Sequence, residues 1–299
     1  MRGILLAGGR GTRLQPVTRA TSKQLLPVYD KPVIYYSLSV LMQIGIREIL
    51  IVCAPDAMSA FRALLGDGRH LGIELSYAAQ ARPRGIAEAL VIGEPHIAGG
   101  DCALMLGDNI FHGPGLGERL RKAAADLDGC VLFGKEVAEP RSFGVAGFDE
   151  DGALVSVEEK PENPRSKQAV TGLYFYDDRA SRIAAELSPS PRGELEITDV
   201  NRFYVEERSA HLVPLDDDFL WYDTGTEESL FDAGAHVRRL THEHGFRVGC
   251  VEQVALEMGF IDAEECFRLG REMGDSPYGR YVVDVARSLD REYREGEVL

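Results

Sequence analysis

Short apolar runs recur along the first 135 residues and alternate with amphipathic segments. Buried strands are predicted for the runs Gly3–Ala7, Ile49–Cys53, Glu74–Ala78, Cys102–Leu106 and Cys130–Gly134. Apolar residues spaced three and four apart predict helices from Pro32 onward and over Ile86–Ile92 and Leu116–Leu127. Strands that alternate with helices are typical of an α/β protein whose mainly parallel sheet is covered on both faces.

After residue 135 the pattern changes to short strands separated by charged, turn-rich loops. Strands at Phe143–Phe148, Val155–Glu159 and Leu173–Tyr176 favour a partly antiparallel lobe beside the parallel sheet. The stretch Ser188–Gly193 predicts a rigid loop and not a linker between domains. From Glu227 the chain turns mostly helical, with helices predicted over Glu227–Glu243, Asp262–Met273 and about Arg280–Arg294.

Composition and charge narrow the class of protein. The 299 residues are 44% hydrophobic and 27% charged, which is typical of a globular chain. A net charge of −15 argues against a broad nucleic-acid or anionic-membrane surface, so any phosphate site has to be a local basic pocket. The five cysteines are scattered and form no CxxC pair, which predicts reduced thiols in a cytoplasmic protein. No apolar run approaches the roughly 20 residues of a membrane span, and Met1–Gly3 leads straight into a strand, not a signal peptide.

A glycine-rich turn, Gly8–Leu14, follows the first predicted strand. Glycines let backbone N–H groups approach phosphate oxygens because no Cβ blocks them, although a tight strand–helix turn has the same composition. Leu14 stands where a dinucleotide fingerprint needs a small residue, and no Lys-Ser/Thr follows Gly11 as a P-loop requires. Arg13 and Lys23 instead flank the turn, and two cations there suit a triphosphate that loses its diphosphate.

This turn and several later blocks resemble one family of enzymes. Gly8–Leu14, with Pro16, Lys23 and Pro27, resembles the N-terminal motif of the sugar-1-phosphate nucleotidyltransferases. Within that family the resemblance is to the thymidylyltransferases that act on glucose 1-phosphate, through the blocks Ser22–Ile34, Leu106–Asn109, Glu158–Pro161, Ala169–Asp177, Pro191–Asn201 and Trp221–Thr226. It implies Mg²⁺-dependent transfer of a thymidylyl group from dTTP to α-D-glucose 1-phosphate. The sugar phosphate attacks the α-phosphorus in line, giving dTDP-glucose and diphosphate.

The resemblance assigns the nucleotide to the first half of the chain. It implies that Arg13 holds the β- and γ-phosphates through its planar fork, with Lys23 in the same phosphate cluster. Gln80 and Gly85 match the positions that contact the base, and a glutamine amide offers a donor and an acceptor to the N3–H and O4 edge of thymine or uracil. The implied nucleotide-binding residues are Leu6, Gly8, Gly9, Gly11, Thr12, Arg13, Lys23, Gln24, Gln80, Gly85 and Asp108.

The implied metal and sugar sites lie in later blocks. Asp108, which follows an apolar strand, and Asp223 are assigned a shared Mg²⁺. From the residues alone, the more common roles are a helix N-cap for Asp108 and a turn residue for Asp223. The implied catalytic residues position and neutralise anions, because a phosphate nucleophile needs little help from a base; they are Arg13, Lys23 and Lys160. The implied sugar-phosphate-binding residues are Asn109, Phe143, Gly144, Glu159, Lys160 and Val170.

Three residues depart from the family pattern and bear on selectivity. Phe143 stands where a tyrosine is usual beside the sugar, Arg84 replaces an acidic residue before Gly85, and Gly147 replaces a glutamate. The same chemistry with UTP or with another hexose 1-phosphate is therefore the first alternative. A non-catalytic, nucleotide-sensing subunit is a remoter alternative, because such subunits typically lose the cations or carboxylates that this sequence keeps. The block Glu194–Asp199 is characteristic of the family but receives no role here.

The predicted organisation is one Rossmann-like nucleotidyltransferase domain over residues 1–240, followed by a mostly helical extension over 241–299. The nucleotide-binding half covers about 1–135 and the sugar-binding half about 136–226. By resemblance the chain is a homotetramer with its C-terminal helices near the subunit contacts. Its implied partners are dTTP and glucose 1-phosphate, with no nucleic acid and no membrane.

Overall fold

The computed structural model describes residues 1–9 and 11–296, with side chains described up to Ser288. Residues 297–299 of the predicted C-terminal extension therefore lie outside the described part. The strands are β1 (Arg2–Ala7), β2 (Pro27–Val28), β3 (Lys31–Pro32), β4 (Glu48–Cys53), β5 (Glu74–Ala79), β6 (Cys102–Leu106), β7 (Asn109–His112), β8 (Cys130–Glu136), β9 (Gly144–Phe148), β10 (Leu154–Glu159), β11 (Gln168–Tyr176), β12 (Ala210–Leu215) and β13 (Leu220–Asp223). The helices are α1 (Val33–Ile44), α2 (Met58–Leu65), α3 (Glu88–Ile92), α4 (Glu94–Ile97), α5 (Leu116–Ala125), α6 (Ala180–Glu186), α7 (Ile197–Glu206), α8 (Glu227–His244), α9 (Val251–Glu257), α10 (Ala263–Glu272) and α11 (Pro277–Gly296).

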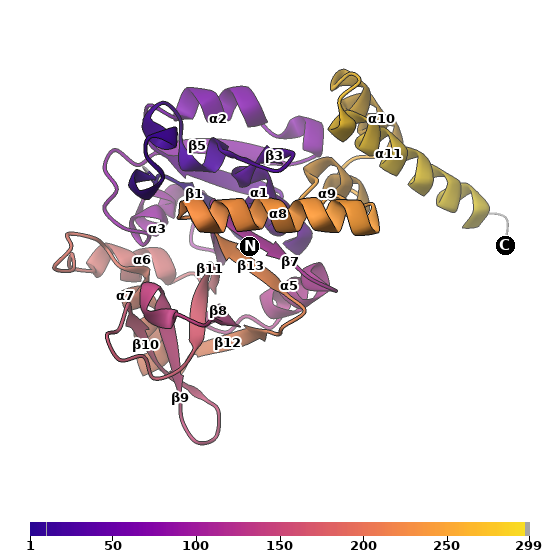
Figure 1. Cartoon of the computed structure of the whole chain (residues 1–299). Coiled ribbons are helices and arrows are strands. Elements are labelled where there is room, and N and C mark those ends of the chain that lie inside the picture. Colours follow the sequence, from indigo (N-terminus) through magenta and orange to yellow (C-terminus); the bar gives the residue numbers. More distant parts are fainter. Residues whose placement is uncertain (10, 297–299) are drawn as a thin grey trace.

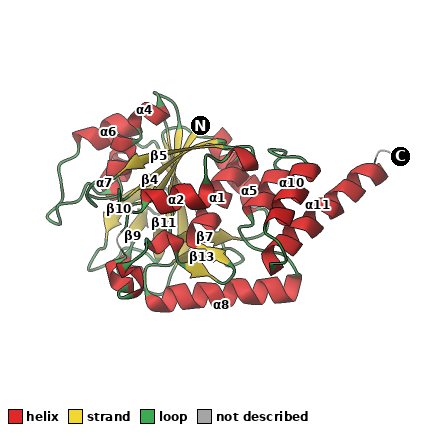
Figure 2. Ribbon diagram, turned by 90° about the horizontal axis from the view of Figure 1, so that it is seen from above, coloured by secondary structure: helices red, strands yellow, loops and turns green. Residues whose placement is uncertain are grey.

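A mixed sheet forms the centre of the molecule, in the order β10-β9-β11-β6-β1-β4-β5, with β8 paired to β11 and β12 paired to β8. The strands β6, β1, β4 and β5 run parallel to one another. Beyond β6 each strand is antiparallel to its neighbour: β11 to β6, β9 to β11 and β10 to β9. Seen from above, helices lie on both faces of this sheet (Figure 2). The predicted α/β fold, with a mostly parallel half and a partly antiparallel half, is confirmed.

The central strands are apolar on both faces because both faces are covered. Leu5 and Ile51 pack into one core cluster with α1, while Ile4 and Leu50, their neighbours in sequence, pack into a second cluster on the opposite face. Alternate residues of a strand point to opposite faces, so a strand buried on both sides reads as a continuous apolar run. This is why the sequence pattern placed these strands within one or two residues of their observed ends.

Several elements were not predicted from the sequence. They are α2, α4, α6, α7, α9, β2, β3, β7, β12 and β13. In addition, β11 begins at Gln168, five residues before its predicted start at Leu173. The early part of β11 is interrupted by a register shift between Val170 and Tyr174. There the backbone N–H of Gly172 donates to the side chain of Asn109 at 3.2 Å. Because Gln168, Thr171 and Gly172 interrupt the apolar residues, no regular apolar pattern marks the segment.

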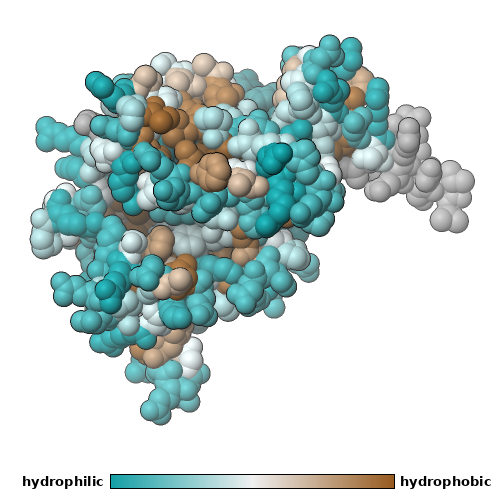
Figure 3. All heavy atoms as spheres, in the orientation of Figure 1, coloured by the Kyte–Doolittle hydropathy of each residue, from teal (hydrophilic) through white to brown (hydrophobic). Residues whose placement is uncertain are grey.

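Two long-range connections place the site. The strand β13 returns from far along the chain and pairs antiparallel with β7, which directly follows the carboxyl end of β6. Helix α8 crosses in front of β7 and β13, while α10 and α11 project to one side (Figure 1). Arg247 forms an ion pair with Asp30 and thereby ties the C-terminal helices to the segment that follows Lys23. The face seen in Figure 3 is largely hydrophilic, as the charge predicts, and it is hollowed between the two halves of the sheet.

Candidate active site

The glycine-rich turn and the acidic end of β6 lie side by side because β1 and β6 are parallel neighbours. The N–H of Gly107 donates to the carbonyl of Leu6 at 2.8 Å, and a Cβ on Gly107 would lie 2.9 Å from that oxygen, so only glycine fits. Asp108 therefore lies at the carboxyl end of the parallel strand β6, where open α/β sheets bind ligands. Both the N–H and the hydroxyl of Thr224 bond the carbonyl of Asp108, at 3.1 and 2.8 Å, which brings Asp223 to the same place.

Lys23 joins the two carboxylates. Its ammonium group forms an ion pair with Asp108 and lies 3.7 Å from Asp223 Oδ1, and the lysine is buried. Burial and the charge of Asp108 raise the pKa of the Asp223 carboxyl, while Lys23 and Arg13 oppose that rise. A Cβ on Gly225 would lie 2.7 Å from Arg13 Nη2, so the Arg13 guanidinium packs beside the same carboxylate. Lys23 thus neutralises two acids at once, in addition to any phosphate role.

Side chains of the segment that follows the glycine-rich turn support it. Gly11 has a left-handed backbone (φ 59°), which glycine adopts without strain, and its carbonyl accepts a hydrogen bond from Thr18 at 2.7 Å. Gln24 is buried under the turn, and its Nε2 would lie 3.7 Å from a Cβ on Gly9. Thr12 and Arg13 follow on a short 3₁₀ helix and are exposed. The turn therefore carries backbone N–H groups beside one exposed guanidinium.

Gln80 and Gly85 meet Gly8 at the edge of the same turn. A Cβ on Gly8 would lie 2.1 Å from Gln80 Oε1, so the amide oxygen lies directly over this glycine. Gln80 Nε2 donates to the Gly85 carbonyl at 3.2 Å and to the Glu88 carboxylate at 2.9 Å. Both amide hydrogens of Gln80 are therefore used within the protein, and the sequence-based expectation that this amide also donates to a base is not matched by the geometry. Gly85 has φ 103° and its N–H donates no hydrogen bond within the described residues.

The predicted sugar-binding residues gather at the antiparallel half of the sheet. Gly144 pairs with Val170 on one side and with Glu159 on the other. Glu159 Oε2 accepts a hydrogen bond from the hydroxyl of Thr198 at 2.6 Å, and Lys160 Nζ lies 3.5 Å from Glu159 Oε1. Lys160 has φ 44°, a left-handed conformation that is strained for a residue with a side chain and that clusters at functional sites.

A chain of contacts joins the two groups of residues. The Phe143 ring lies 5.1 Å from the Trp221 ring, and the Trp221 indole donates to Asn109 Oδ1 at 2.7 Å. Asn109 Nδ2 then donates to Asp108 Oδ1 at 2.9 Å. Asn109 is only 1% exposed, so in this structure its main contacts are to the protein and it holds Asp108 in place. These contacts bring residues predicted for the sugar and residues predicted for the phosphates together.

The structure adds functional candidates that the sequence reasoning missed. Thr198, from the block that received no role, orients Glu159, and Arg192 places a second cation 3.4 Å from the same carboxylate. Leu195 accepts a hydrogen bond from Ala87 and donates one to Arg84, so that block also braces the Gly85 loop. No local signal marks these partners because each lies tens of residues from the group it contacts.

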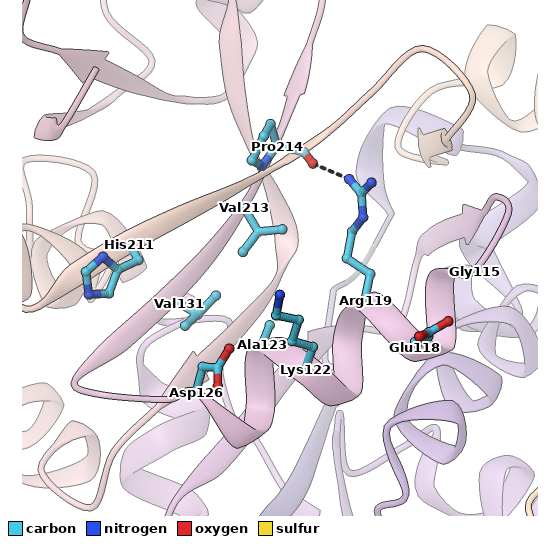
Figure 4. A pocket seen from close by; sticks show the side chains of 10 residues that line it. All are labelled: Gly115, Glu118, Arg119, Lys122, Ala123, Asp126, Val131, His211, Val213 and Pro214. Atoms are coloured by element: carbon cyan, nitrogen blue, oxygen red, sulfur yellow. Dashed lines mark hydrogen bonds between the residues drawn. The ribbon is translucent and has the colours of Figure 1, made fainter. Parts of the chain in front are cut away.

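A separate cavity of about 700 Å³ opens between α5 and β12 (Figure 4). Arg119 crosses it and donates to the carbonyl of Pro214 at 2.8 Å. None of the residues predicted for the site is among those that line it, so it belongs to another part of the surface. Among the described helices, none combines the length and apolar composition that crossing a membrane needs.

Known proteins are similar to this chain over most of its length. The model of the nucleotidyl transferase family matches residues 2–239. The glucose-1-phosphate thymidylyltransferase of Xanthomonas campestris is 50% identical over 286 residues, which is 96% of this chain and 97% of that protein. The enzyme of the same name from Mycolicibacterium smegmatis is 49% identical over 98% of this chain and 100% of its own. A Bacillus anthracis crystal structure described as a glucose-1-phosphate thymidylyltransferase superposes with a TM-score of 0.74 at 37% identity, covering 80% of this chain and 95% of that one. The chain therefore belongs to the nucleotidyl transferase family, and within it to the group that contains the glucose-1-phosphate thymidylyltransferases.

Proposed function

We propose that this protein transfers a thymidylyl group from dTTP to α-D-glucose 1-phosphate, giving dTDP-glucose and diphosphate. The observation that carries the proposal is the near-complete similarity, 50% identity over 96% of the chain, to an enzyme named for this reaction. The contacts from Phe143 through Trp221 and Asn109 to Asp108 support it, because they join a sugar-type end and a phosphate-type end in one site.

The base is assigned to Gln80 and Gly85. Gln80 Oε1 is an acceptor for the N3–H of thymine or uracil, and the Gly85 N–H is a donor for O4. Because both hydrogens of the Gln80 amide already have acceptors, the donor comes from the backbone and not from the side chain. Discrimination among bases then rests on one acceptor and one donor at the edge of the glycine turn.

The phosphates are assigned to the turn. Backbone N–H groups of Gly8, Gly9 and Gly11, beside Leu6 and Thr12, bind phosphate oxygens, and Gln24 supports the turn from below. Arg13 holds the β- and γ-phosphates and stabilises the charge that develops on the leaving diphosphate.

The sugar phosphate is assigned to the antiparallel half. Glu159, held by Thr198, accepts hydrogen bonds from sugar hydroxyls, and Lys160 binds the sugar phosphate. Gly144 and Val170 form the wall beside them, and Phe143 packs against the sugar without a hydroxyl to offer. Asn109 has one amide hydrogen without a described acceptor, which it can give to the sugar.

Asp108 and Asp223 fit a divalent cation. Both carboxylates converge on one ammonium group, and hard oxygen ligands are those that Mg²⁺ prefers. No third Asp, Glu, His or Cys joins them within the described residues, so phosphate oxygens and water complete the ligand set. When bound, Mg²⁺ supplies charge that lets two anionic substrates approach each other.

The residues then act by position and charge. An ionised oxygen of the sugar phosphate forms the new bond to the α-phosphorus, and the bond to the β-phosphate oxygen breaks with its electron pair leaving on diphosphate. Because the nucleophile is already an anion, no side chain has to take a proton. Lys160 aligns the nucleophile, Lys23 keeps the two carboxylates in place, and Arg13 receives the leaving group.

A matrix of purified enzyme with dTTP, UTP, dCTP, GTP and ATP against glucose, galactose and mannose 1-phosphates, with release of diphosphate measured, tests the proposal. dTTP with glucose 1-phosphate should give the highest kcat/KM, and EDTA should abolish turnover until Mg²⁺ is restored. Preferred use of UTP or of another hexose 1-phosphate would select the first alternative. Nucleotide binding without diphosphate release in any pair would select the nucleotide-sensing subunit.

The organisation and assembly are part of the proposal. We assign residues 1–135 to the nucleotide, 136–226 to the sugar and 241–299 to a helical extension that contacts other subunits of a homotetramer in the cytoplasm. Light scattering on the purified chain, compared with a chain that ends before α10, tests the assembly.

A further inference from the structure

Glu88 fixes the orientation of the Gln80 amide. A glutamine amide can be turned by 180° with little change in shape, which exchanges a donor for an acceptor. Gln80 is 5% exposed and Glu88 is 6% exposed, so water cannot satisfy the amide in place of the carboxylate. Gln80 Nε2 lies 2.9 Å from Glu88 Oε2 and 3.2 Å from the Gly85 carbonyl, and both partners are oxygens that accept.

The reversed amide is disfavoured by both partners. It would turn Gln80 Oε1 toward a carboxylate oxygen and a carbonyl oxygen and leave three acceptors without a donor in a buried place. An unpaired buried polar group costs about 1–3 kcal/mol, and more when it is charged. The amide oxygen therefore stays over Gly8, where no described residue donates a hydrogen bond to it.

The two oxygens of the Glu88 carboxylate have different partners. Arg84 Nε and Nη2 contact Glu88 Oε1 at 2.8 and 2.6 Å, which leaves Oε2 to Gln80. The Arg84 side chain is 64% exposed, and it contacts the carboxylate from the solvent side. Glu88 is thus held as an acceptor facing Gln80, while the ion pair itself is largely in solvent and contributes little.

We propose that Glu88 is a specificity-determining positioning residue that makes the enzyme read thymine or uracil and reject cytosine. The inference rests on the proposed contact of Gln80 and Gly85 with the base. An acceptor from Gln80 and a donor from Gly85 complement N3–H and O4 of thymine. Cytosine presents an acceptor at N3 and a donor at N4, so both contacts are mismatched. If the amide could turn, the mismatch at N3 would be relieved and only the one at N4 would remain.

The test is the ratio of kcat/KM for dTTP over dCTP in four proteins: wild type, Glu88→Ala, Glu88→Gln and Arg84→Ala. In Glu88→Ala the ratio should fall about tenfold, mostly through a lower KM for dCTP, because one relieved mismatch is worth about that much. Glu88→Gln keeps an oxygen that can accept, so its ratio should stay within about threefold of wild type. Arg84→Ala leaves Glu88 Oε2 on Gln80 and should behave like wild type.

A purely structural role for Glu88 predicts a different result. Damage to the loop would lower kcat/KM for dTTP and dCTP alike and leave their ratio unchanged in Glu88→Ala, which would overturn the inference. Calorimetric binding of dTTP and dCTP to wild type and Glu88→Ala, without any sugar, separates this inference from the proposed reaction. A wild-type preference for dTTP in binding that collapses in Glu88→Ala upholds the inference even if glucose 1-phosphate is not the acceptor. An unchanged binding ratio, or a wild type that binds dCTP as well as dTTP, refutes it.

Discussion

Replacing Asn109 by alanine is expected to weaken the fold, because one buried amide holds three groups together. Its Oδ1 accepts from the Trp221 indole at 2.7 Å and from the Gly172 N–H at 3.2 Å, and its Nδ2 donates to Asp108 at 2.9 Å. Asn109→Ala leaves the two donors without an acceptor. Each buried group left unpaired costs about 1–3 kcal/mol, and a water molecule can replace part of the bonding. The free energy of unfolding should therefore fall by about 2–4 kcal/mol, from the 5–15 kcal/mol usual for a domain.

The same substitution should slow the reaction. Asp108 loses the donor that orients its carboxylate, and a hydrogen bond to a charged group is worth about 1.5–3 kcal/mol, so kcat should fall about tenfold or more. Thermal unfolding followed by circular dichroism should show Tm lowered by about 4–12 °C. Diphosphate release at 25 °C, well below either Tm, gives kcat for the folded variant.

Asn201→Ala is the matched control. Asn201 is also 1% exposed, and its Oδ1 accepts from the Tyr176 hydroxyl at 2.6 Å, in a part of the core that has no assigned role in the reaction. It should lose about 1–3 kcal/mol of stability and keep its kcat. If Asn109→Ala unfolds within about 2 °C of wild type, or if it loses no more activity than Asn201→Ala, the proposed support of Asp108 is wrong.

Three further predictions concern single groups. Arg13→Ala should lower kcat by about two to three orders of magnitude, the usual effect of removing a charge contact to a leaving group, and should leave Tm unchanged because the side chain is exposed. The control Arg19→Ala, which removes another exposed arginine of the same segment, should keep its kcat. An Arg13→Ala variant as active as wild type would exclude the assigned role. Thr198→Val removes the hydroxyl that donates to Glu159 and should raise KM for glucose 1-phosphate about threefold to tenfold. Thr198→Ser keeps a hydroxyl and should have the KM of wild type. Equal KM values in the two variants would refute a role of this hydrogen bond in sugar binding. Burial raises the pKa of Cys53 to about 11, and all five cysteines are buried. At about pH 8 the thiolate is therefore scarce, and the folded protein should resist a disulfide reagent until it is denatured. Rapid labelling of the native protein would contradict the buried placement.

Local pattern was enough for the parts of this protein that are determined by neighbours in sequence. The strands from Gly3–Ala7 to Cys130–Gly134 could be read because residues buried on both faces form continuous apolar runs. The glycine turn could be read because a left-handed residue at Gly11 needs glycine. The placement of Asp108 at a strand end followed from the same run. The family resemblance then supplied the remaining site residues. The 50% identity to a named relative over 96% of the chain agrees with the resemblance.

Tertiary structure alone decided which of these residues touch. Lys23 reaches Asp108 across 85 residues of sequence, and Trp221 reaches Asn109 across 112. The short strands β7 and β13 have too few residues to form a pattern, and they are strands only because each is the other's partner. The orientation of the Gln80 amide depends on Glu88, which is a surface-type residue by composition and becomes buried only when α3 packs against the sheet. Propensity and periodicity act over a few residues, whereas the contacts between distant residues depend on distances that only the packed chain sets. Sequence pattern alone therefore determined the layers of the fold, and packing determined the site.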